Sequence, residues 1–379
     1  MIAKTSKKTS QKIGVVLLGS TGNIGTQTLQ ILKKHKDKFE IIGLACHHNE
    51  KLLKKQTKEF KVPLKNAIVT SKNPPQKINH LIKNSHTEII VNAISGEAGL
   101  KPSIAALKAR KILALANKES IVLEGKKLIT LAKKYSTKIL PLDSEHHAIA
   151  RILKEKNLTK FAPQKITLTC SGGPFFGWPR KQLAKATIKD ALKHPTWRMG
   201  PKITLESATL LNKGYELIEA HHLFNCPLKN LDAIIDRKSY IHAIVEFKNP
   251  PLASGHAACS SSIRTQPPDF TCRTPASGHA AAARSLALAY PPDMRIPIED
   301  TLLSYYHSKT GKKFKNPKLK FLTKNQLKNH RFYKIDHKTF PAIKETIKAY
   351  KQNRIKQFFR QKEKNIGLFL KGKIKFTQV

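Results

Sequence analysis

Residues 141–147 (PLDSEHH) place two carboxylates, Asp143 and Glu145, one residue apart directly after an apolar run. The run at residues 139–142 predicts a β-strand that opens into a loop. Because alternate strand residues point to the same face, the two carboxylates are expected to direct their oxygens at one point. Like charges this close need a proton or a cation between them, and Mg²⁺ or Mn²⁺ takes oxygen ligands. The stretch indicates a divalent-metal site, although a solvated turn is the ordinary interpretation of so short a motif.

A second polar group lies in residues 204–224, where apolar residues recur at helical spacing. Asn212, Lys213 and Glu216 fall on one side of this predicted helix, because positions three and four apart are neighbours. Ser207 is placed near the helix start. Such a face is usually exposed to solvent; here it would supply a phosphate site (Ser207, Asn212 and Lys213) and a third metal carboxylate, Glu216.

Two loops carry further groups suited to a ligand. Ser171 follows a predicted strand at residues 166–169 and precedes two glycines, so its hydroxyl and the bare N–H groups can contact an anion. Residues 194–200 are bounded by Pro and Gly and are predicted to form a loop. Its Trp197 and Met199 either pack on the core or form a lid that excludes water from a substrate.

The elements that would position these groups begin with a strand, a glycine turn and a helix. Residues 13–18 are apolar and β-branched, GSTGNIG follows at residues 19–25, and helical spacing continues to Lys34. This is the context of a dinucleotide-binding turn, whose glycines let backbone N–H groups approach a pyrophosphate. The spacing is G-x-x-G-x-x-G and not G-x-G-x-x-G, so the motif is less specific on its own.

The second predicted strand, residues 39–45, ends without an acidic residue for the ribose hydroxyls. His47, His48, Asn49 and Lys51 there are compatible with a 2′-phosphate, which favours NADPH over NADH. The paired histidines are equally compatible with exposed side chains that have no ligand.

Further strands are predicted at residues 67–70, 89–94 and 112–115, with helices between them. This alternation indicates an α/β fold with an open, doubly wound parallel sheet. The strand at 112–115 leads into Lys118 and Glu119, at the edge where such sheets bind ligands.

Composition excludes little. The chain has 379 residues, 70 Lys and Arg against 25 Asp and Glu, and a formal charge of +45. No apolar run is long enough to span a membrane, and the basic N-terminal residues lack the apolar core of a secretory signal. Lysines are spread along the chain instead of gathered in a stripe, so nucleic-acid binding is not favoured. Five cysteines without a C-x-x-C pair suggest reduced thiols in a cytoplasmic protein.

Taken together, the motifs resemble the 1-deoxy-D-xylulose 5-phosphate reductoisomerase family. The resemblance is carried by GSTGNIGTQTL, LANKES, LDSEHHAI, SGGPF, HPTWRMGPKITLESATLLNKGYELIEAHHLF and PDMRIPI, which cover most of residues 13–248 and a return at 290–300. It implies a Rossmann-like NADPH domain (1–142), an α+β catalytic and connective domain (143–300) and a small C-terminal helical domain (312–379).

The resemblance also implies site residues. The metal ligands would be Asp143, Glu145 and Glu216. The substrate phosphate would be bound by Ser171, Ser207, Asn212 and Lys213. Ser144, Lys118 and His194 would contact substrate, with Lys118, Glu145 and His194 as the catalytic groups, under a lid that contains Trp197 and Met199. NADPH would be bound by Gly19, Ser20, Thr21, Gly22, Asn23 and Ile24, with His48, Asn49, Asn117 and Glu119.

The implied reaction is a metal-assisted skeletal rearrangement followed by hydride transfer from NADPH, giving 2-C-methyl-D-erythritol 4-phosphate. The family implies a phosphorylated sugar substrate and a homodimer. Two alternatives remain at this point: an NADP-linked dehydrogenase of the homoserine type, or a decayed homologue that acts as a basic nucleic-acid-binding protein.

Three stretches depart from the family pattern. Residues 249–290 contain no lysine and repeat the string ASGHAA, so we expect an insertion that is disordered or looped out. Residues 236–239 read Asp-Arg-Lys-Ser where the family has His-Pro-Gln-Ser. The basic residues 353–364 and a short C-terminus indicate an altered helical domain with less apolar surface to bury.

Overall fold

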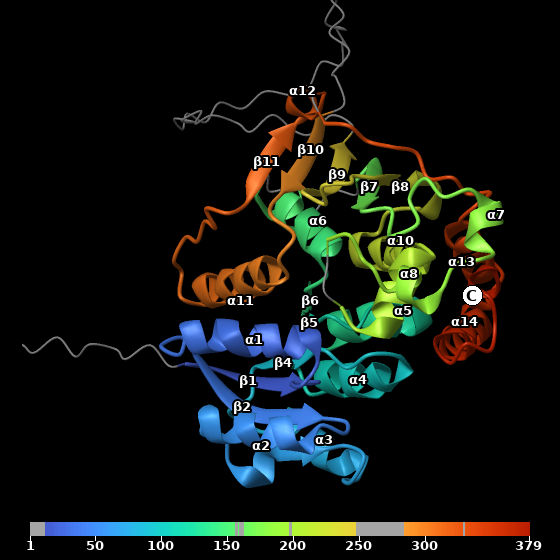
Figure 1. The fold of residues 1–379 in the computed structure, drawn as a ribbon. Coiled ribbons are helices and arrows are strands. Elements are labelled where there is room, and N and C mark those ends of the chain that lie inside the picture. The colour runs from blue at the N-terminus through green and yellow to red at the C-terminus, as the bar shows by residue number, and fades with distance from the viewer. Residues whose placement is uncertain (1–11, 156–157, 159–162, 197–198, 248–283, 329) are drawn as a thin grey trace, which may run out of the picture.

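The computed structural model describes residues 12–155, 158, 163–196, 199–247, 284–328 and 330–379, which form two sheets with helices around them (Figure 1). Sheet A has six parallel strands in the order β3-β2-β1-β4-β5-β6. This order is that of a doubly wound nucleotide-binding sheet, so the predicted fold class is confirmed. Its strands are β1 Ile13–Leu18, β2 Phe39–Cys46, β3 Ala67–Val69, β4 Ile89–Asn92, β5 Ile112–Leu115 and β6 Ile139–Pro141.

Sheet A is buried on both faces because its strands are apolar at nearly every position. All six residues of β1 are buried, and alternate residues enter two separate apolar clusters. One cluster includes residues of α1, α2 and α11; the other includes residues of α3, α4 and α5. These helices are α1 Asn23–Lys34, α2 Glu50–Glu59, α3 Pro75–Lys83, α4 Leu100–Lys108, α5 Lys118–Lys134 and α11 Arg295–Lys309, with short turns at η1 Leu64–Asn66 and η2 Glu97–Gly99.

Sheet B is mixed, in the order β11-β10-β9-β7-β8, and α6 and α10 pack on one side of it (Figure 1). Its strands are β7 Lys165–Cys170, β8 Leu231–Ile235, β9 Ile241–Phe247, β10 Arg284–Ala289 and β11 Lys320–Thr323. The remaining helices are α6 Ser144–Glu155, α7 Arg180–Leu183, α8 Ile188–Ala191, α9 Pro201–Ala208, α10 Leu211–Phe224, α12 Lys324–Leu327, α13 Ala342–Lys351 and α14 Ile355–Leu370, with η3 Leu228–Asn230 and η4 Phe376–Gln378.

The predicted insertion at 249–290 is wrong at its C-terminal end. Residues 284–289 form β10, which pairs with β9 and β11 in the interior of sheet B. The Lys-poor composition extends into this strand because its small apolar residues are fully buried, as at Ala287 and Ala289. Residues 248–283 lie outside the described part of the chain.

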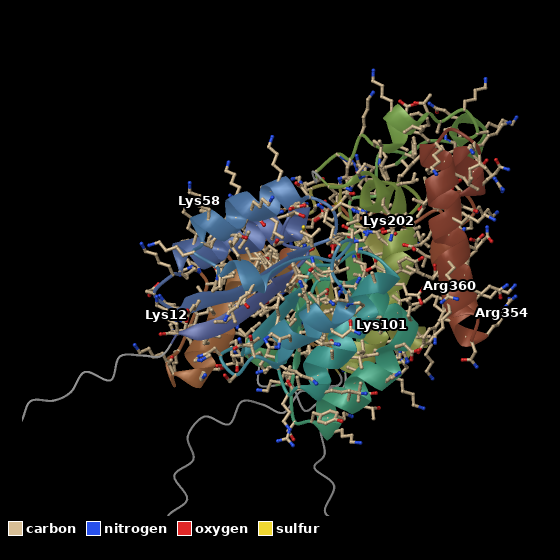
Figure 2. All side chains as sticks on the ribbon, turned by 90° about the horizontal axis from the view of Figure 1, so that it is seen from below. Lys12, Lys58, Lys101, Lys202, Arg354 and Arg360 are labelled. Atoms are coloured by element: carbon tan, nitrogen blue, oxygen red, sulfur yellow. The ribbon has the colours of Figure 1, made fainter. Side chains whose placement is uncertain are left out.

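The C-terminal helices bury more apolar surface than their basic sequence suggests. Phe359 of α14 is fully buried and packs against Tyr215 of α10, and Ile343, Ile366 and Phe369 join the same cluster. Arg360 of α14 and Arg354, which caps the helix, are exposed instead, and both are labelled in Figure 2. The positive charge is distributed over the surface in the same way, for example at Lys12, Lys58 and Lys101. Within the described residues, no helix is both long and apolar enough to cross a membrane.

Candidate active site

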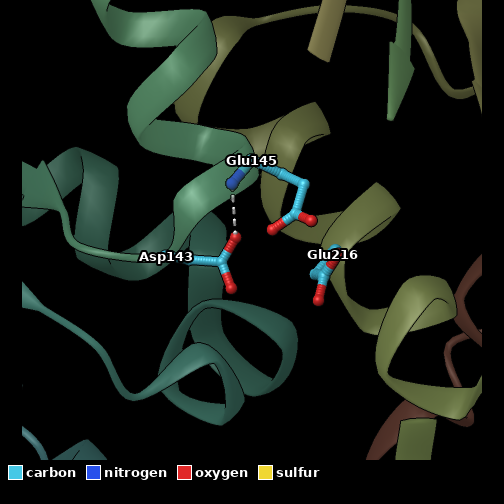
Figure 3. Close-up of side chains that lie close together, drawn as sticks. All are labelled: Asp143, Glu145 and Glu216. Atoms are coloured by element: carbon cyan, nitrogen blue, oxygen red, sulfur yellow. Dashed lines mark hydrogen bonds between the residues drawn. The ribbon is translucent and has the colours of Figure 1, made fainter. Parts of the chain in front are cut away.

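The two sequence-adjacent carboxylates converge, but not for the expected reason. Strand β6 ends at Pro141 and α6 begins at Ser144, so Asp143 precedes a helix and Glu145 lies in its first turn. The predicted alternation along a strand is therefore wrong. The turn into the helix brings the side chains together instead, and the Glu145 N–H donates to Asp143 Oδ1 at 3.1 Å (Figure 3).

Glu216 completes the group from a distant helix. Oxygens of Asp143, Glu145 and Glu216 all lie within 4.8 Å of one another, and Figure 3 shows the three side chains facing a common point. The single helix predicted for residues 204–224 is two helices, α9 and α10, because Leu210 adopts a left-handed conformation (φ 61°) between them. Ser207 accordingly lies at the end of α9 and not near a helix start.

Two lysines, the half-buried Lys118 and the buried Lys213, neutralise the carboxylates. Lys118 Nζ lies 2.9 Å from Asp143 Oδ2 and 2.8 Å from Glu216 Oε1. Lys213 Nζ lies 3.4 Å from Glu145 Oε1 and pairs with Glu216. Burial opposes the charged form of Lys118, yet the adjacent Asp143 and Glu216 raise its pKa well above the ordinary value. The cluster thus holds its negative charges only because cations are placed among them.

Glu145 differs from Asp143 in its electrostatics. Burial raises the pKa of Glu145 to about 7, and the neighbouring carboxylates Glu216 and Asp143 add to this, whereas Lys213 opposes it. Burial would also raise the pKa of Asp143, but Lys118 holds it well below its usual range. Ser144 Oγ donates to Glu145 Oε2 at 2.7 Å and fixes that carboxylate.

His146 is a site residue that the sequence reasoning missed. Its Nδ1 lies 3.0 Å from Asp143 Oδ1 and its Nε2 lies 2.9 Å from the Glu216 carbonyl oxygen. Burial disfavours its charged form, but Glu219, 3.6 Å away, and Asp143 raise its pKa to about 9. The only signal in the sequence was its place three residues after Asp143, on the same side of a helix.

A histidine and two serines form a second polar group. His194 Nε2 is 3.2 Å from Ser171 Oγ and 3.0 Å from Ser207 Oγ, so the structure brings these three predicted residues together. Burial, aided by the charge of Arg237, lowers the pKa of His194 to about 4. Gly173 next to it has φ 68°, and a Cβ there would meet the Ser207 carbonyl at 3.0 Å.

Arg237 explains one departure from the family pattern. Its Nη1 donates to the carbonyls of Ser171 at 2.5 Å and Gly173 at 3.1 Å, and its guanidinium stacks on Phe176. The residue that replaces part of His-Pro-Gln-Ser therefore braces the loop that carries Ser171.

Asn212 and Lys213 share a face of α10 with Glu216, as predicted, but both contact the carboxylate side. Asn212 Nδ2 lies 3.4 Å from Glu216 Oε1, and Lys213 Nζ donates to the Thr169 carbonyl at 2.6 Å. Asn212 Oδ1 is buried without a hydrogen-bond partner among the described residues. Asn212 Oδ1 is therefore an acceptor, next to Glu216, that a cation or a hydrogen-bond donor of a ligand can contact.

Comparison with known proteins identifies the family. Models of 1-deoxy-D-xylulose 5-phosphate reductoisomerase match residues 15–77 and 65–125, and models of its C-terminal domains match 139–224 and 290–379. The reductoisomerase of Agathobacter rectalis is 35% identical over 96% of this chain and 90% of its own length. That of Geotalea uraniireducens is 34% identical, over 96% and 88%. The chain belongs to the 1-deoxy-D-xylulose 5-phosphate reductoisomerase family.

Solved structures of reductoisomerases have the same fold. A DOX-P reductoisomerase in complex with NADPH, fosmidomycin and magnesium superposes with a TM-score of 0.75 at 29% identity, covering 96% of this chain and 86% of that one. The enzyme of Zymomonas mobilis in complex with NADPH gives a TM-score of 0.73 at 28% identity, covering 97% and 89%.

The glycine turn of this reductoisomerase chain has the shape that its sequence predicted. Gly19 has φ 83°, and a Cβ on Gly25 would lie 2.1 Å from the Gly19 carbonyl oxygen, so both positions require glycine. Gly22 caps α1 without a side chain, which leaves the first turn open to a phosphate. Thr21, Asn23 and Ile24 lie next to Gly22 in the sequence, and their contact with NADPH remains a prediction.

Other predicted cofactor residues have structural partners. Ser20 is buried and its hydroxyl donates to Gln56. Asn49 caps α2 by accepting from Leu52 N, while His48 is exposed next to it. Asn117 donates to the carbonyls of residues 94 and 96, and Glu119 accepts from the residue 96 N–H.

Of the two lid residues that the reductoisomerase resemblance implied, Met199 is half-buried immediately before α9. Trp197 lies outside the described residues. The lid stays a prediction.

Proposed function

We propose that this chain catalyses the NADPH- and divalent-metal-dependent conversion of 1-deoxy-D-xylulose 5-phosphate into 2-C-methyl-D-erythritol 4-phosphate. The observation that carries the proposal is the convergence of Asp143, Glu145 and Glu216 within 4.8 Å, in a member of the reductoisomerase family. A homoserine-type dehydrogenase does not need three convergent carboxylates. An inactive, decayed homologue would have no functional reason to keep them together.

The donor set fits a hard divalent ion. Asp143, Glu145 and Glu216 would hold Mg²⁺ or Mn²⁺ through oxygens, with the open Asn212 Oδ1 adjacent. When bound, the ion supplies a Lewis acid that polarises substrate oxygens. Lys118 bridges Asp143 and Glu216, so it competes with a cation for these oxygens and is available as a donor to substrate when the cation is bound.

The remaining side chains position the substrate. Ser171, Ser207 and His194 would bind the phosphate through hydroxyls and a neutral imidazole, aided by the positive charge of Arg237 behind the loop. Asn212 and Lys213, which contact the carboxylates Glu216 and Glu145, would add two donors for the same phosphate. The glycine turn at the edge of sheet A would hold NADPH, which supplies the hydride.

The test is loss of NADPH absorbance when 1-deoxy-D-xylulose 5-phosphate is added to the purified full chain. We expect oxidation that EDTA abolishes and Mn²⁺ or Mg²⁺ restores, with the methylerythritol phosphate identified by mass spectrometry. Oxidation that EDTA does not affect, or turnover of aspartate semialdehyde instead, would contradict the proposal. Salt-sensitive retention on DNA or RNA without turnover would favour the decayed homologue.

We further propose a cytoplasmic homodimer. The free thiols of Cys46, Cys170 and Cys226 support a reducing compartment. A small apolar cluster on sheet B, whose Ile244 and Leu322 are only half-buried, supports association of two copies through that sheet. Light scattering coupled to gel filtration measures the mass directly.

A further inference from the structure

A buried chain of hydrogen bonds lies behind the metal ligands. Tyr290 OH donates to the Ser144 carbonyl at 2.8 Å, His147 Nδ1 lies 3.1 Å from Tyr290 OH, and His147 Nε2 lies 2.8 Å from Asp300 Oδ2. Tyr290 and Asp300 are fully buried, and His147 is 2% exposed. We name these three residues, with Ser144 as their end point, the α6 relay.

The relay passes through both nitrogens of the His147 ring. Tyr290 OH donates to the Ser144 carbonyl, and His147 Nδ1 lies within hydrogen-bond distance of the same hydroxyl. Asp300 accepts from His147 Nε2 and, at 3.0 Å, is paired with Arg151. The two nitrogens of the His147 ring therefore connect Tyr290 on one side to Asp300 on the other.

The end point matters because Ser144 stands between two carboxylates of the metal cluster. The Ser144 hydroxyl donates to Glu145 Oε2 at 2.7 Å, and the backbone N–H of His147 donates to the Asp143 carbonyl at 2.8 Å. We propose that Tyr290, His147 and Asp300 are positioning residues that hold the first turn of α6, and thereby Asp143 and Glu145, in metal-binding geometry. The inference rests on the proposed function, since it assumes that these carboxylates bind a metal.

The relay is anchored at both ends by other elements. Glu299, next to Asp300 on α11, lies 2.7 Å from both Lys34 and His35 of α1. At the other end, the His242 ring stacks on Tyr290 with centroids 3.9 Å apart, and its Nε2 lies 3.1 Å from the Tyr290 carbonyl oxygen. A helix that packs on sheet A and a strand of sheet B therefore fix the start of α6 together.

Loss of the Tyr290 hydroxyl is expected to weaken metal binding. Tyr290→Phe keeps the stacked ring but leaves His147 Nδ1 and the Ser144 carbonyl short of a buried partner. Loss of groups that orient metal ligands weakens metal affinity by about 10- to 100-fold. Because Tyr290 acts through a backbone carbonyl, we expect the lower end, about tenfold weaker Mn²⁺ binding.

The experiment titrates Mn²⁺ into the purified full chain and measures free Mn²⁺ by electron paramagnetic resonance, with thermal unfolding recorded on the same samples. The matched control is Tyr305→Phe, which removes a tyrosine hydroxyl that donates to Glu88 at 2.7 Å from the same stretch of chain. We expect the control to stay within about twofold of wild type, since it has no path to α6.

A pair of substitutions at His147 keeps the test decisive if Tyr290→Phe does not fold. The amide nitrogen of Asn reaches the place of Nδ1, so His147→Asn retains the Tyr290 contact. That of Gln reaches the place of Nε2, so His147→Gln retains only the Asp300 contact. We expect Mn²⁺ affinity to be kept within about threefold in the Asn variant and to fall about tenfold in the Gln variant.

The outcomes separate the two proposals. Equal loss in Tyr290→Phe and Tyr305→Phe, a lower unfolding temperature with unchanged Mn²⁺ affinity, or equal affinities for both His147 variants would overturn the relay. Wild-type Mn²⁺ affinity in Asp143→Asn and Glu216→Gln would instead overturn the metal site of the proposed function. Loss of binding in those two variants, with full binding in Tyr290→Phe, defeats the relay alone.

Discussion

Two partly buried clusters in this chain each gather three carboxylates with lysine, and only one of them has metal-binding geometry. The metal cluster is Asp143, Glu145 and Glu216 with Lys118 and Lys213. The second, which we name the brace cluster, is Glu119, Glu206 and Glu363 around Lys202.

The difference lies in what occupies the centre. In the brace cluster Lys202 Nζ is central, 3.5 Å from Glu119 Oε1, 3.8 Å from Glu206 Oε1 and in close contact with Glu363. In the metal cluster the oxygens of all three carboxylates lie within 4.8 Å of one another, and each lysine pairs with only two of the three carboxylates. Among the described residues, only the metal cluster meets the condition of mutual oxygen proximity. The number of carboxylates therefore says little, whereas their convergence indicates a cation site.

The brace cluster connects helices that are far apart in the sequence. Lys202 lies in the first turn of α9, Glu119 in the first turn of α5 and Glu363 on α14. One ammonium therefore connects α5, which packs on sheet A, to the C-terminal helices. Glu119 also accepts from the Gly96 N–H, which fixes the loop after β4.

Removing a carboxylate from the metal cluster should have the largest effect. We expect Glu216→Gln to lower kcat/KM about 1,000-fold, because Lewis-acid stabilisation is worth several kcal/mol. The matched control is Glu219→Gln, one turn further on α10 and equally buried, which we expect to stay within about tenfold. Steady-state NADPH oxidation measures both, and similar losses in the two variants would remove the distinction between ligand and neighbour.

Lys118 separates metal binding from catalysis within the same cluster. Because its ammonium lies on the Asp143 and Glu216 oxygens, Lys118→Met removes a competitor for the cation. We expect Mn²⁺ affinity to be unchanged or higher while kcat falls about 100-fold through loss of a substrate contact. Mn²⁺ titration beside kinetics at saturating metal measures this. Loss of Mn²⁺ binding in the variant would show instead that Lys118 holds the ligands in place.

Much of this arrangement could be predicted from local sequence. The buried strands of sheet A and the glycine turn follow from apolar runs and from Gly19, and the shared face of Asn212, Lys213 and Glu216 follows from helical spacing. Each of these features depends on a few neighbouring residues, so a short stretch of sequence is enough to predict it.

The remainder depends on partners far apart in the chain. The left-handed Leu210 that divides α9 from α10 has no local signal, because a leucine rarely takes that conformation. Convergence of Asp143 and Glu145 was predicted from strand alternation, yet it arises from a helix start. Lys202 and Glu363 are 161 residues apart, and Tyr290 and Ser144 are 146 apart, so no periodicity relates them.

The brace cluster should govern stability and not metal binding. We expect Lys202→Met to lower the free energy of unfolding by about 2 kcal/mol, because buried Glu119 and Glu206 lose their cation. Mn²⁺ affinity should stay within about twofold. The control is Lys101→Met, an exposed lysine, for which a change below about 0.5 kcal/mol is expected. Urea unfolding and Mn²⁺ titration are measured for both variants. Weaker Mn²⁺ binding in Lys202→Met would show that the brace cluster also supports the metal site.

The smallest effect should be a pH dependence confined to the brace cluster. Burial raises the pKa of Glu206 from 4.5 to about 7; Lys202 and Lys118 oppose the rise, and Glu119 and Glu363 add to it. Between these two values the folded state keeps a proton that the unfolded chain releases, so the contribution of Glu206 to stability is lost as the pH rises through this window. Glu206→Gln cannot ionise. We expect the stability of the wild type relative to this variant to fall by about 1–2 kcal/mol from about pH 5 to about pH 7.

Urea unfolding at several pH values measures this difference, and Mn²⁺ titration of Glu206→Gln serves as its control. Tyr215, whose pKa is also raised by burial next to Glu206, titrates above this window and does not contribute. Parallel stability curves for wild type and variant would mean that Glu206 stays ionised beside Lys202 across this window, and would overturn the raised pKa of Glu206.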